Sequence, residues 1–293
     1  MPINFLHSYS PHPIALQIGP IAVHWYGLLI VMAILAGYWL SGLLAKKRGL
    51  SPEAIYSVYV NMVIWGVLGA RAYHVLVIDF GFYWSHPAQI PAIWNGGLAI
   101  HGAIIAGVLA LAYGARKYKI NFWNSADLFV IPAILGQAIG RWGNYFNQEL
   151  FGRPSSVPWS IPIDAANRGQ EFAQYQYFHP TFLYESLWNL TIFAALCFLY
   201  ISGRRTSAAP SEAKTSAEAK DGIVFWMYIA LYSVGRIGME FVRIDMPPEI
   251  YGIRLPLAVS GILVFVGVFM VIRKLQVTSY KLQKQKSSQV PKS

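Results

Sequence analysis

Long apolar stretches alternate with short polar segments along most of the chain. Seven of the stretches are long enough to cross a bilayer as helices, because about 20 apolar helical residues span the roughly 30 Å hydrocarbon core. They cover residues 21–45, 54–78, 93–115, 122–141, 181–201, 222–242 and 255–272. The pattern predicts an all-α polytopic membrane protein with seven transmembrane helices.

The composition agrees with a membrane protein. The 293 residues are 55% hydrophobic and 15% aromatic, and only 12% are charged, which is too apolar for a water-soluble fold. The first apolar stretch does not have the pattern of a cleaved signal peptide, because residues 1–20 contain no Lys or Arg and the stretch is too long. We expect it to remain in the mature protein.

The basic residues predict the orientation in the membrane. Lys and Arg in short loops are retained on the cytoplasmic side, and most of the 23 basic residues follow odd-numbered apolar stretches. These clusters lie at 46–48, 116–119, 204–220 and 273–292. We therefore expect the N-terminus outside and the C-terminus inside. The net charge of +10 reflects this bias, so no nucleic-acid partner is expected.

The polar segments predict how the chain is organised. Residues 1–275 read as one membrane-embedded domain, which includes a compact, ordered external cap at 143–180, rich in Pro and aromatic residues. The cytoplasmic linker 203–221 is rich in Ala, Ser, Lys and Glu. This linker and the basic tail 276–293 are expected to be disordered.

Ionisable and aromatic hydroxyl side chains gather at one depth of the predicted bundle. Charges inside a bilayer cost about 2.5 to 3.5 kcal/mol each on the insertion scale, so they usually face a partner or a wet cavity. In the predicted orientation, nine such side chains fall in the outer half: His24, Tyr26, Arg71, His74, His101, Arg141, Glu185, Arg236 and Glu240. Only Asp127 departs from this depth. The sequence predicts a polar chamber that opens toward the outer leaflet.

Two polar motifs suit an anionic ligand. In "GRWGNYFNQELFG", residues 140–152, Arg141 and Asn144 are three residues apart and share a helix face. In "LYSVGRIGMEFVR", Tyr232, Arg236 and Glu240 form a stripe at intervals of four. Guanidinium groups bind phosphate oxygens bidentately, and a phospholipid headgroup is the nearest phosphate to a membrane surface.

These motifs resemble those of the bacterial prolipoprotein diacylglyceryl transferases. "GRWGNYFNQELFG" looks like the family signature, and "HWYG", "GAR", "NGGLAIHG", "HPTFLYES" and "YSVGRIGME" follow the family order. "GAIIAG" after His101 and "GRIGME" depart from the usual "GGLIG" and "GRFFIE" types, which concerns local packing. The residues that carry the family's functional roles by motif position are Tyr26, His101, Arg141, Asn144, Glu149, Gly152, Arg236 and Glu240.

The resemblance implies an activity. A diacylglyceryl group would move from phosphatidylglycerol to the thiol of the lipobox cysteine of a preprolipoprotein signal peptide, which gives a thioether and glycerol 1-phosphate. The implied partners are phosphatidylglycerol, these signal peptides and the lipid bilayer. The implied location is the bacterial plasma (inner) membrane, with the active site toward the outer leaflet. No cofactor and no metal are expected, since the histidines have no close ligand spacing.

The chemistry suggests roles for the matched residues. His101 is the candidate base for the thiol, and Arg141 and Arg236 would stabilise the charge that grows on the departing phosphate. Asn144 and Tyr26 would orient the headgroup. The other expected phosphatidylglycerol-binding residues are Glu149, Gly152, Tyr232 and Glu240, and the two carboxylates among them would hold the arginines.

Each role has a structural alternative. Arg236 with Glu240 can be a plain intramembrane ion pair, and His101 can be a packed histidine. His24 with Tyr26 can be an interfacial pair, and for Arg71 the structural role is the favoured one. For the whole protein, the alternatives are a phospholipid-headgroup hydrolase that uses water and an anion transporter. Against a transporter, the polar groups stop in the outer half and no inverted repeat is visible.

Overall fold

The computed structural model describes residues 3–202, 221–244, 249–250 and 252–289. It divides into two compact units. The first consists of residues 1–37 and 130–293, and the second of residues 38–129. Two helices, α2 (Trp25–Arg48) and α6 (Phe122–Phe146), run from one unit into the other. Of the predicted linker, residues 203–220 lie outside the described residues.

Five helices of the described chain are long and apolar enough to cross a membrane. Besides α2 and α6 they are α3 (Pro52–Tyr73), which a π-helical turn η1 (His74–Ile78) prolongs, α7 (Thr181–Ser202) and α10 (Leu255–Gln289). The third and sixth apolar stretches form α5 (Ile100–Lys117) and α9 (Ile223–Glu240), each of 18 residues. Such helices are about 27 Å long. The structure therefore confirms a mostly helical multi-pass architecture, while the number seven and the orientation stay predictions.

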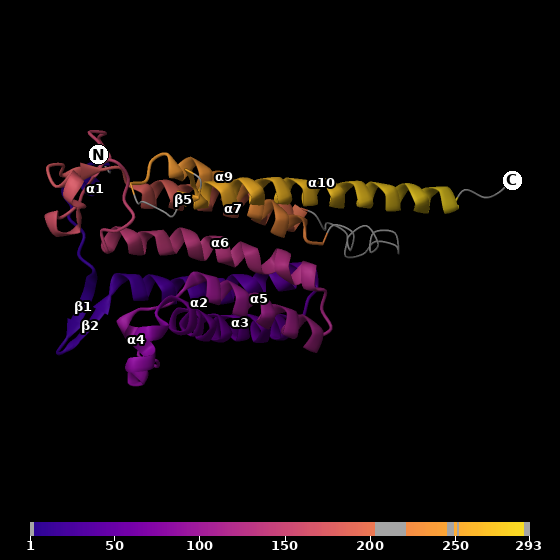
Figure 1. Cartoon of the computed structure of the whole chain (residues 1–293). Coiled ribbons are helices and arrows are strands. Elements are labelled where there is room, and N and C mark those ends of the chain that lie inside the picture. Colours follow the sequence, from indigo (N-terminus) through magenta and orange to yellow (C-terminus); the bar gives the residue numbers. More distant parts are fainter. Residues whose placement is uncertain (1–2, 203–220, 245–248, 251, 290–293) are drawn as a thin grey trace. The chain divides into compact units, whose positions relative to one another are not determined.

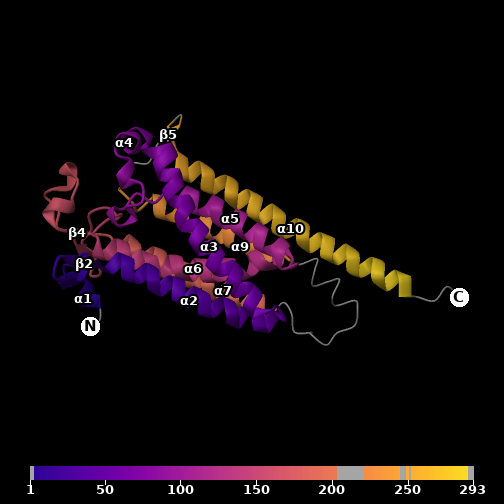
Figure 2. The same cartoon turned by 90° about the horizontal axis from the view of Figure 1, so that it is seen from below.

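In the first unit, helix α9 packs against both α7 and α10 (Figures 1 and 2). Small residues permit the close approach. A Cβ at Gly235 of α9 would clash with the indole of Trp188 on α7, and a Cβ at Gly267 of α10 would lie 3.0 Å from the Cβ of Ala230 on α9. The packing of α7 against α9 places the polar faces of these two helices opposite each other.

The chain enters α2 from a β-hairpin. Strands β1 (Ile14–Ile18) and β2 (Ile21–His24) pair antiparallel, with Ile18 opposite Ile21. Gly19 in the turn has φ +58°, a conformation that glycine adopts without steric cost. The first transmembrane helix was expected to begin at residue 21, and this was wrong, because residues 21–24 are the second strand.

The segment after α6 folds around a small aromatic core. Its regular elements are short: η4 (Ala165–Asn167), η5 (Gln170–Phe172) and the paired strands β3 (Ile161–Pro162) and β4 (Tyr177–Phe178). The buried core consists of Tyr145, Phe151, Ile161, Ile163, Phe178 and Phe182. The N-terminal helix α1 (Ile3–Ser8) packs against it through Leu6. The cap was expected to begin at residue 143, but residues 143–146 are the end of α6.

Gln148 joins this segment to the N-terminal residues. It is 4% exposed, its Nε2 donates to the carbonyl of Pro11 (2.8 Å) and to Oδ2 of Asp164 (2.7 Å), and its Oε1 accepts from the amide of Asp164 (2.6 Å). Ser10 donates to Oδ1 of Asp164 (2.9 Å). The hydrogen bonds from Gln148 and Ser10 favour the carboxylate and lower the pKa of Asp164.

In the second unit, α3 packs against α5. Ser51 begins α3, because its hydroxyl accepts from the amide of Ala54 (3.2 Å) and Pro52 follows at the first helical position. A Cβ at Gly102 would clash with the carbonyl of Gly69, so the two backbones lie in contact. The close approach fixes the start of α5 against the C-terminal part of α3.

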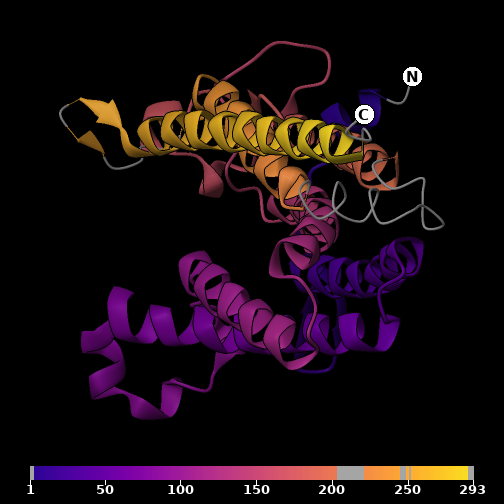
Figure 3. The same ribbon diagram turned by 90° about the vertical axis from the view of Figure 1, so that its right-hand side faces the viewer.

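A loop with short helices connects α3 to α5 and appears in purple in Figure 3. It contains α4 (Phe80–Ser85), η2 (Pro87–Gln89) and η3 (Ile93–Asn95). The third apolar stretch was expected to be helical from residue 93, and this was wrong. Gly96 and Gly97 have φ +87° and +73°, so they end the short turn before α5 begins at Ile100.

Helix α10 follows a small hairpin of β5 (Glu249–Ile250) and β6 (Ile253–Arg254). It begins where the seventh apolar stretch predicted, at Leu255, but it continues to Gln289. The tail 276–293 was expected to be disordered. The helix instead extends through its described part, so this expectation was wrong as far as Gln289.

Candidate active site

Arg141 lies on the last turns of α6, which continues through the signature as far as Phe146. Its two terminal nitrogens have different partners. Nη2 forms an ion pair with Oε2 of Glu185 at 2.7 Å, and Nη1 donates to Oδ1 of Asn144 at 3.3 Å. The predicted shared helix face of Arg141 and Asn144 is present as a direct contact.

Glu185, near the start of α7, binds two arginines. Its Oε2 pairs with Arg141, and its Oε1 pairs with Nη1 of Arg243 at 3.2 Å. Glu185 is 8% exposed and Arg243 is 7% exposed, so little water screens this bridge. The carboxylate on Arg141 is therefore Glu185 and not Glu149.

Glu149 contacts asparagines instead of an arginine. Its Oε1 accepts from Nδ2 of Asn144 at 2.7 Å and from Nδ2 of Asn147 at 3.4 Å. Asn144 thus joins Glu149 to Arg141 in one chain of hydrogen bonds. Glu149 was expected to hold an arginine in place, and its connection to Arg141 passes through Asn144.

Arg236 and Glu240 form the predicted pair on α9. Nη2 of Arg236 lies 3.3 Å from Oε2 of Glu240, and Arg254 approaches the other carboxylate oxygen to 3.5 Å. The Nη1 atom of Arg236 is buried and has no hydrogen-bond partner. Arg236 therefore has a donor to spare beyond its ion pair, as an arginine that binds a ligand requires.

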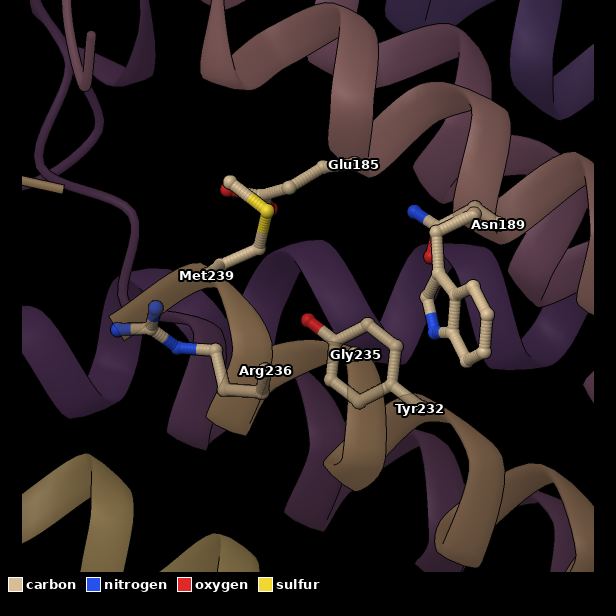
Figure 4. A pocket seen from close by; sticks show the side chains of 7 residues that line it. Glu185, Asn189, Tyr232, Gly235, Arg236 and Met239 are labelled. Atoms are coloured by element: carbon tan, nitrogen blue, oxygen red, sulfur yellow. The ribbon is translucent and has the colours of Figure 1, made fainter. Parts of the chain in front are cut away.

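A pocket lies between α7 and α9, and Arg236 is one of its lining residues (Figure 4). The side chains of Glu185 and Asn189 reach it from α7, and those of Tyr232, Arg236 and Met239 reach it from α9. The full lining is Glu185, Trp188, Asn189, Tyr232, Gly235, Arg236 and Met239. The pocket is lined by a member of each of two charge networks. Glu185 belongs to the network with Arg141 and Arg243, and Arg236 belongs to the network with Glu240 and Arg254.

Tyr26, in the first turn of α2, packs on the signature. A Cβ at Gly143 would clash with the ring of Tyr26, so only glycine fits at this position. The hydroxyl interacts electrostatically with Glu149 and Arg141. The residue as a whole is 37% exposed.

Gly152 ends the signature in close contact with two other segments. Its amide donates to the carbonyl of His179 (2.9 Å), and it forms an isolated β-bridge with Arg243. A Cβ on Gly152 would lie 2.8 Å from the Cβ of His179 and 3.0 Å from the carbonyl oxygen of Val242. Gly152 therefore ties the signature to the segment that carries Arg243.

Arg71 of the second unit is structural. Its nitrogens donate to the carbonyls of Gln89 (2.6 Å), Ile90 (2.7 Å) and Gly96 (2.7 Å), and its guanidinium lies 4.9 Å from the ring centroid of Tyr83. The residue is 7% exposed. It closes the loop between α3 and α5, which confirms the structural alternative.

His101 also belongs to the second unit, and the arginine networks belong to the first. It is the second residue of α5, exposed, with its ring centroid 5.7 Å from that of Tyr73. It was expected about eight residues into a helix, and it instead stands at the helix start. His74 of the same unit lies against Gly97.

The structure adds three residues to the predicted site. Glu185 was noticed only for its depth, and Arg243 and Asn189 were assigned no role. Pairing between α6, α7 and the segment after α9 brings Glu185 and Arg243 together, and no local spacing signals such long-range contacts. Asn189 is four residues after Glu185 on α7, so helix periodicity was the one available signal for it.

Comparison with known proteins gives one consistent result. The family model of the prolipoprotein diacylglyceryl transferases matches residues 13–273. A phosphatidylglycerol–prolipoprotein diacylglyceryl transferase of Trichormus variabilis is 45% identical over 245 residues, which cover 84% of this chain and 83% of the relative. The protein of the same name from Synechocystis sp. is 43% identical over 243 residues, which cover 83% and 82% of the two chains. The chain therefore belongs to the prolipoprotein diacylglyceryl transferase family.

Proposed function

We propose that this protein transfers the diacylglyceryl group of phosphatidylglycerol to the thiol of the lipobox cysteine in preprolipoproteins. The observation that carries the proposal is the family match over residues 13–273, which encloses both arginine networks and the pocket between them. The relatives' names state the two substrates, phosphatidylglycerol and a prolipoprotein. The acceptor within the prolipoprotein is the cysteine thiol of its lipobox.

The phosphate of the lipid binds at the pocket between α7 and α9. Arg236 supports this position, because its Nη1 is buried without a partner and a phosphate oxygen would accept from it. Arg141 is already held by Glu185 and Asn144. Its contribution to the bound phosphate is therefore the positive charge of a guanidinium group in a fixed orientation. Tyr232 lines the same pocket, and its hydroxyl is a further donor for the headgroup.

The reaction is a substitution at carbon. The cysteine S–H gives its proton to a base, and the thiolate forms a C–S bond with the C3 carbon of the diacylglyceryl unit. The C–O bond to phosphate breaks, and its electron pair leaves with glycerol 1-phosphate. A phosphodiester with one negative charge becomes a monoester with up to two, so a prepositioned guanidinium stabilises the transition state more than the bound lipid.

His101 is the proposed base. An imidazole can accept a proton near neutral pH, and a free thiol with a pKa of about 8.5 is only a few per cent thiolate there. Its exposed position at the start of α5 leaves the ring free to meet a substrate. Asn144 and Tyr26 orient the headgroup, and Glu149 fixes Asn144 through their 2.7 Å hydrogen bond.

The proposed setting is the bacterial plasma membrane, with seven transmembrane helices and the active site toward the outer leaflet. The basic residues in the last turns of α2 and α5 support the orientation, since such residues stay cytoplasmic. In this orientation the segment 143–180 is an external cap above the site. A lipoprotein precursor would present its cysteine at the same membrane face.

The test is product chemistry. Purified protein in phosphatidylglycerol-containing nanodiscs is incubated with a lipobox peptide, and with the same peptide carrying serine in place of cysteine as the control. Mass spectrometry should find a thioether-linked diacylglyceryl group on the cysteine peptide alone. Free diacylglycerol with an unmodified cysteine peptide would establish the hydrolase alternative and overturn the proposal.

A further inference from the structure

Asn189 is a buried polar residue that the reaction above does not use. It is 2% exposed, and its Nδ2 atom has no hydrogen-bond partner. A buried donor without a partner costs about 1 to 3 kcal/mol, and such groups in native structures call for an explanation. Arg236, whose Nη1 is likewise buried without a partner, lines the same pocket as Asn189 (Figure 4). Two lining residues that each have an unpaired donor indicate a ligand that carries acceptors.

The two donors differ in chemistry. A guanidinium group has donors only and carries a charge, whereas a carboxamide is neutral and presents a donor beside an acceptor. Phosphate, which has acceptors only, suits the guanidinium group. A hydroxyl group, which is both donor and acceptor, suits the carboxamide. Asn189 is 2% exposed, while the Arg236 side chain keeps 19% of its surface exposed. The neutral amide is therefore the more enclosed of the two groups.

The other polar groups of the α7 wall are already occupied. Both oxygens of Glu185 are in ion pairs, with Arg141 and with Arg243. The indole nitrogen of Trp188 donates to the carbonyl of Leu231 at 3.1 Å. An ammonium headgroup would thus meet no free carboxylate among the lining residues. Asn189 remains as the group of this wall that can bind a polar ligand.

We infer that Asn189 binds a hydroxyl of the lipid headgroup while Arg236 binds the adjoining phosphate. This inference rests on the proposed function and adds to it the residue that distinguishes a hydroxylated headgroup from other phospholipid headgroups. A headgroup without hydroxyls satisfies Arg236 and leaves Asn189 unpaired. Asn189 is thus a specificity-determining residue for the lipid substrate.

The experiment compares two lipids and two variants. Phosphatidylglycerol is compared with phosphatidylpropanol, which has the same phosphodiester but no headgroup hydroxyls, in transfer to a lipobox peptide. Asn189→Leu keeps the size of the side chain and removes its polar atoms. Thr191→Val is the matched control, because Thr191 is an exposed residue of α7 whose hydroxyl bonds to Leu187 of its own helix at 2.9 Å.

Wild-type protein should prefer phosphatidylglycerol in kcat/KM by roughly tenfold, the effect of a hydrogen bond of about 1 to 1.5 kcal/mol. Asn189→Leu should lose this preference by slowing transfer from phosphatidylglycerol alone, and Thr191→Val should retain it. The melting temperature of Asn189→Leu should be unchanged or higher, because an unpaired buried amide has been removed.

Three results would overturn the inference while the proposed function stands. They are equal use of both lipids by the wild type, an unchanged preference in Asn189→Leu, and an equal loss of activity on both lipids in that variant. Failure of the wild-type protein to transfer from phosphatidylglycerol would instead overturn the proposed function. The two failures are therefore distinguishable in one set of assays.

Discussion

Glu185 organises the buried charges of the site. One carboxylate holds Arg141 from α6 and Arg243 from the segment after α9, at 2.7 and 3.2 Å. The sequence predicted the Arg236–Glu240 pair because these residues are one helical turn apart. It could not predict the Glu185 pairs, because their partners lie in other segments and meet only when the helices pack.

Replacing Glu185 with Gln should destabilise the protein. Removing one partner of a buried ion pair leaves uncompensated charge and costs roughly 3 to 5 kcal/mol, and here two arginines lose their partner. The control is Glu249→Gln, because Glu249 is 54% exposed and lies 3.8 Å from Arg254. Exposed pairs contribute about 1 kcal/mol or less.

The measurement is thermal unfolding of both variants in the same detergent. Glu185→Gln should melt several degrees below the wild type. Glu249→Gln should melt at the wild-type temperature. Equal melting temperatures for Glu185→Gln and the wild type would show that the bridge does not stabilise the fold.

Cys197 should have no part in the transfer. It lies on α7 about 18 Å along the helix axis from Glu185, far from the pocket between α7 and α9, and a thiolate in apolar surroundings is costly. Cys197→Ala should keep nearly the wild-type transfer rate. A diacylglyceryl adduct on Cys197, found by mass spectrometry during turnover, would rule this out.

At the scale of elements, the sequence located the interiors of the helices better than their starts. Residues 21–23 of β2 are as apolar as the helix after them, so the strand was taken into the first helix. The turn at Gly19 and Pro20 was the local signal of the hairpin. Residues 93–99 were predicted to be helical because they are apolar. Gly96 and Gly97, which have positive φ, were the local signal that the helix had not yet begun. Apolar content alone does not distinguish an interfacial loop from a membrane helix.

The contact between the signature and the segment after α9 depends on Gly152. Gly152→Ala should weaken this contact, because the added Cβ would lie 2.8 Å from the Cβ of His179 and 3.0 Å from the Val242 carbonyl oxygen. Overpacking of this kind costs about 1 to 3 kcal/mol. The transfer rate should fall as well, since Gly152 pairs with Arg243.

Gly140→Ala is the matched control in the same motif. A Cβ at Gly140 would meet nothing within 4 Å, and alanine in a helix is favoured over glycine by about 0.5 to 1 kcal/mol. Activity and melting temperature should therefore be retained in this variant and lost in Gly152→Ala. Equal behaviour of the two would refute the packing role of Gly152.

At the scale of the whole molecule, the membrane orientation can be measured directly. Reporters fused after Arg48, Lys119, Arg205 or Lys274 should report the cytoplasm, because basic residues precede each fusion point. A reporter inserted within 155–175 should report the outside. A cytoplasmic signal from that segment would contradict the orientation and the outer-leaflet site together.

The most direct test of the active site is the transfer rate of Arg236→Lys. Lysine keeps the charge but loses the planar pair of donors, so it cannot both pair with Glu240 and grip a phosphate whose charge is growing. Removal of a preorganised donor typically slows the chemical step about 10²- to 10³-fold. The measurement is single-turnover transfer from phosphatidylglycerol to a lipobox peptide, on folded protein with a wild-type melting temperature. A loss of that size with nearly unchanged lipid binding is the expected result, and a wild-type rate would contradict the assignment of Arg236 to the departing phosphate.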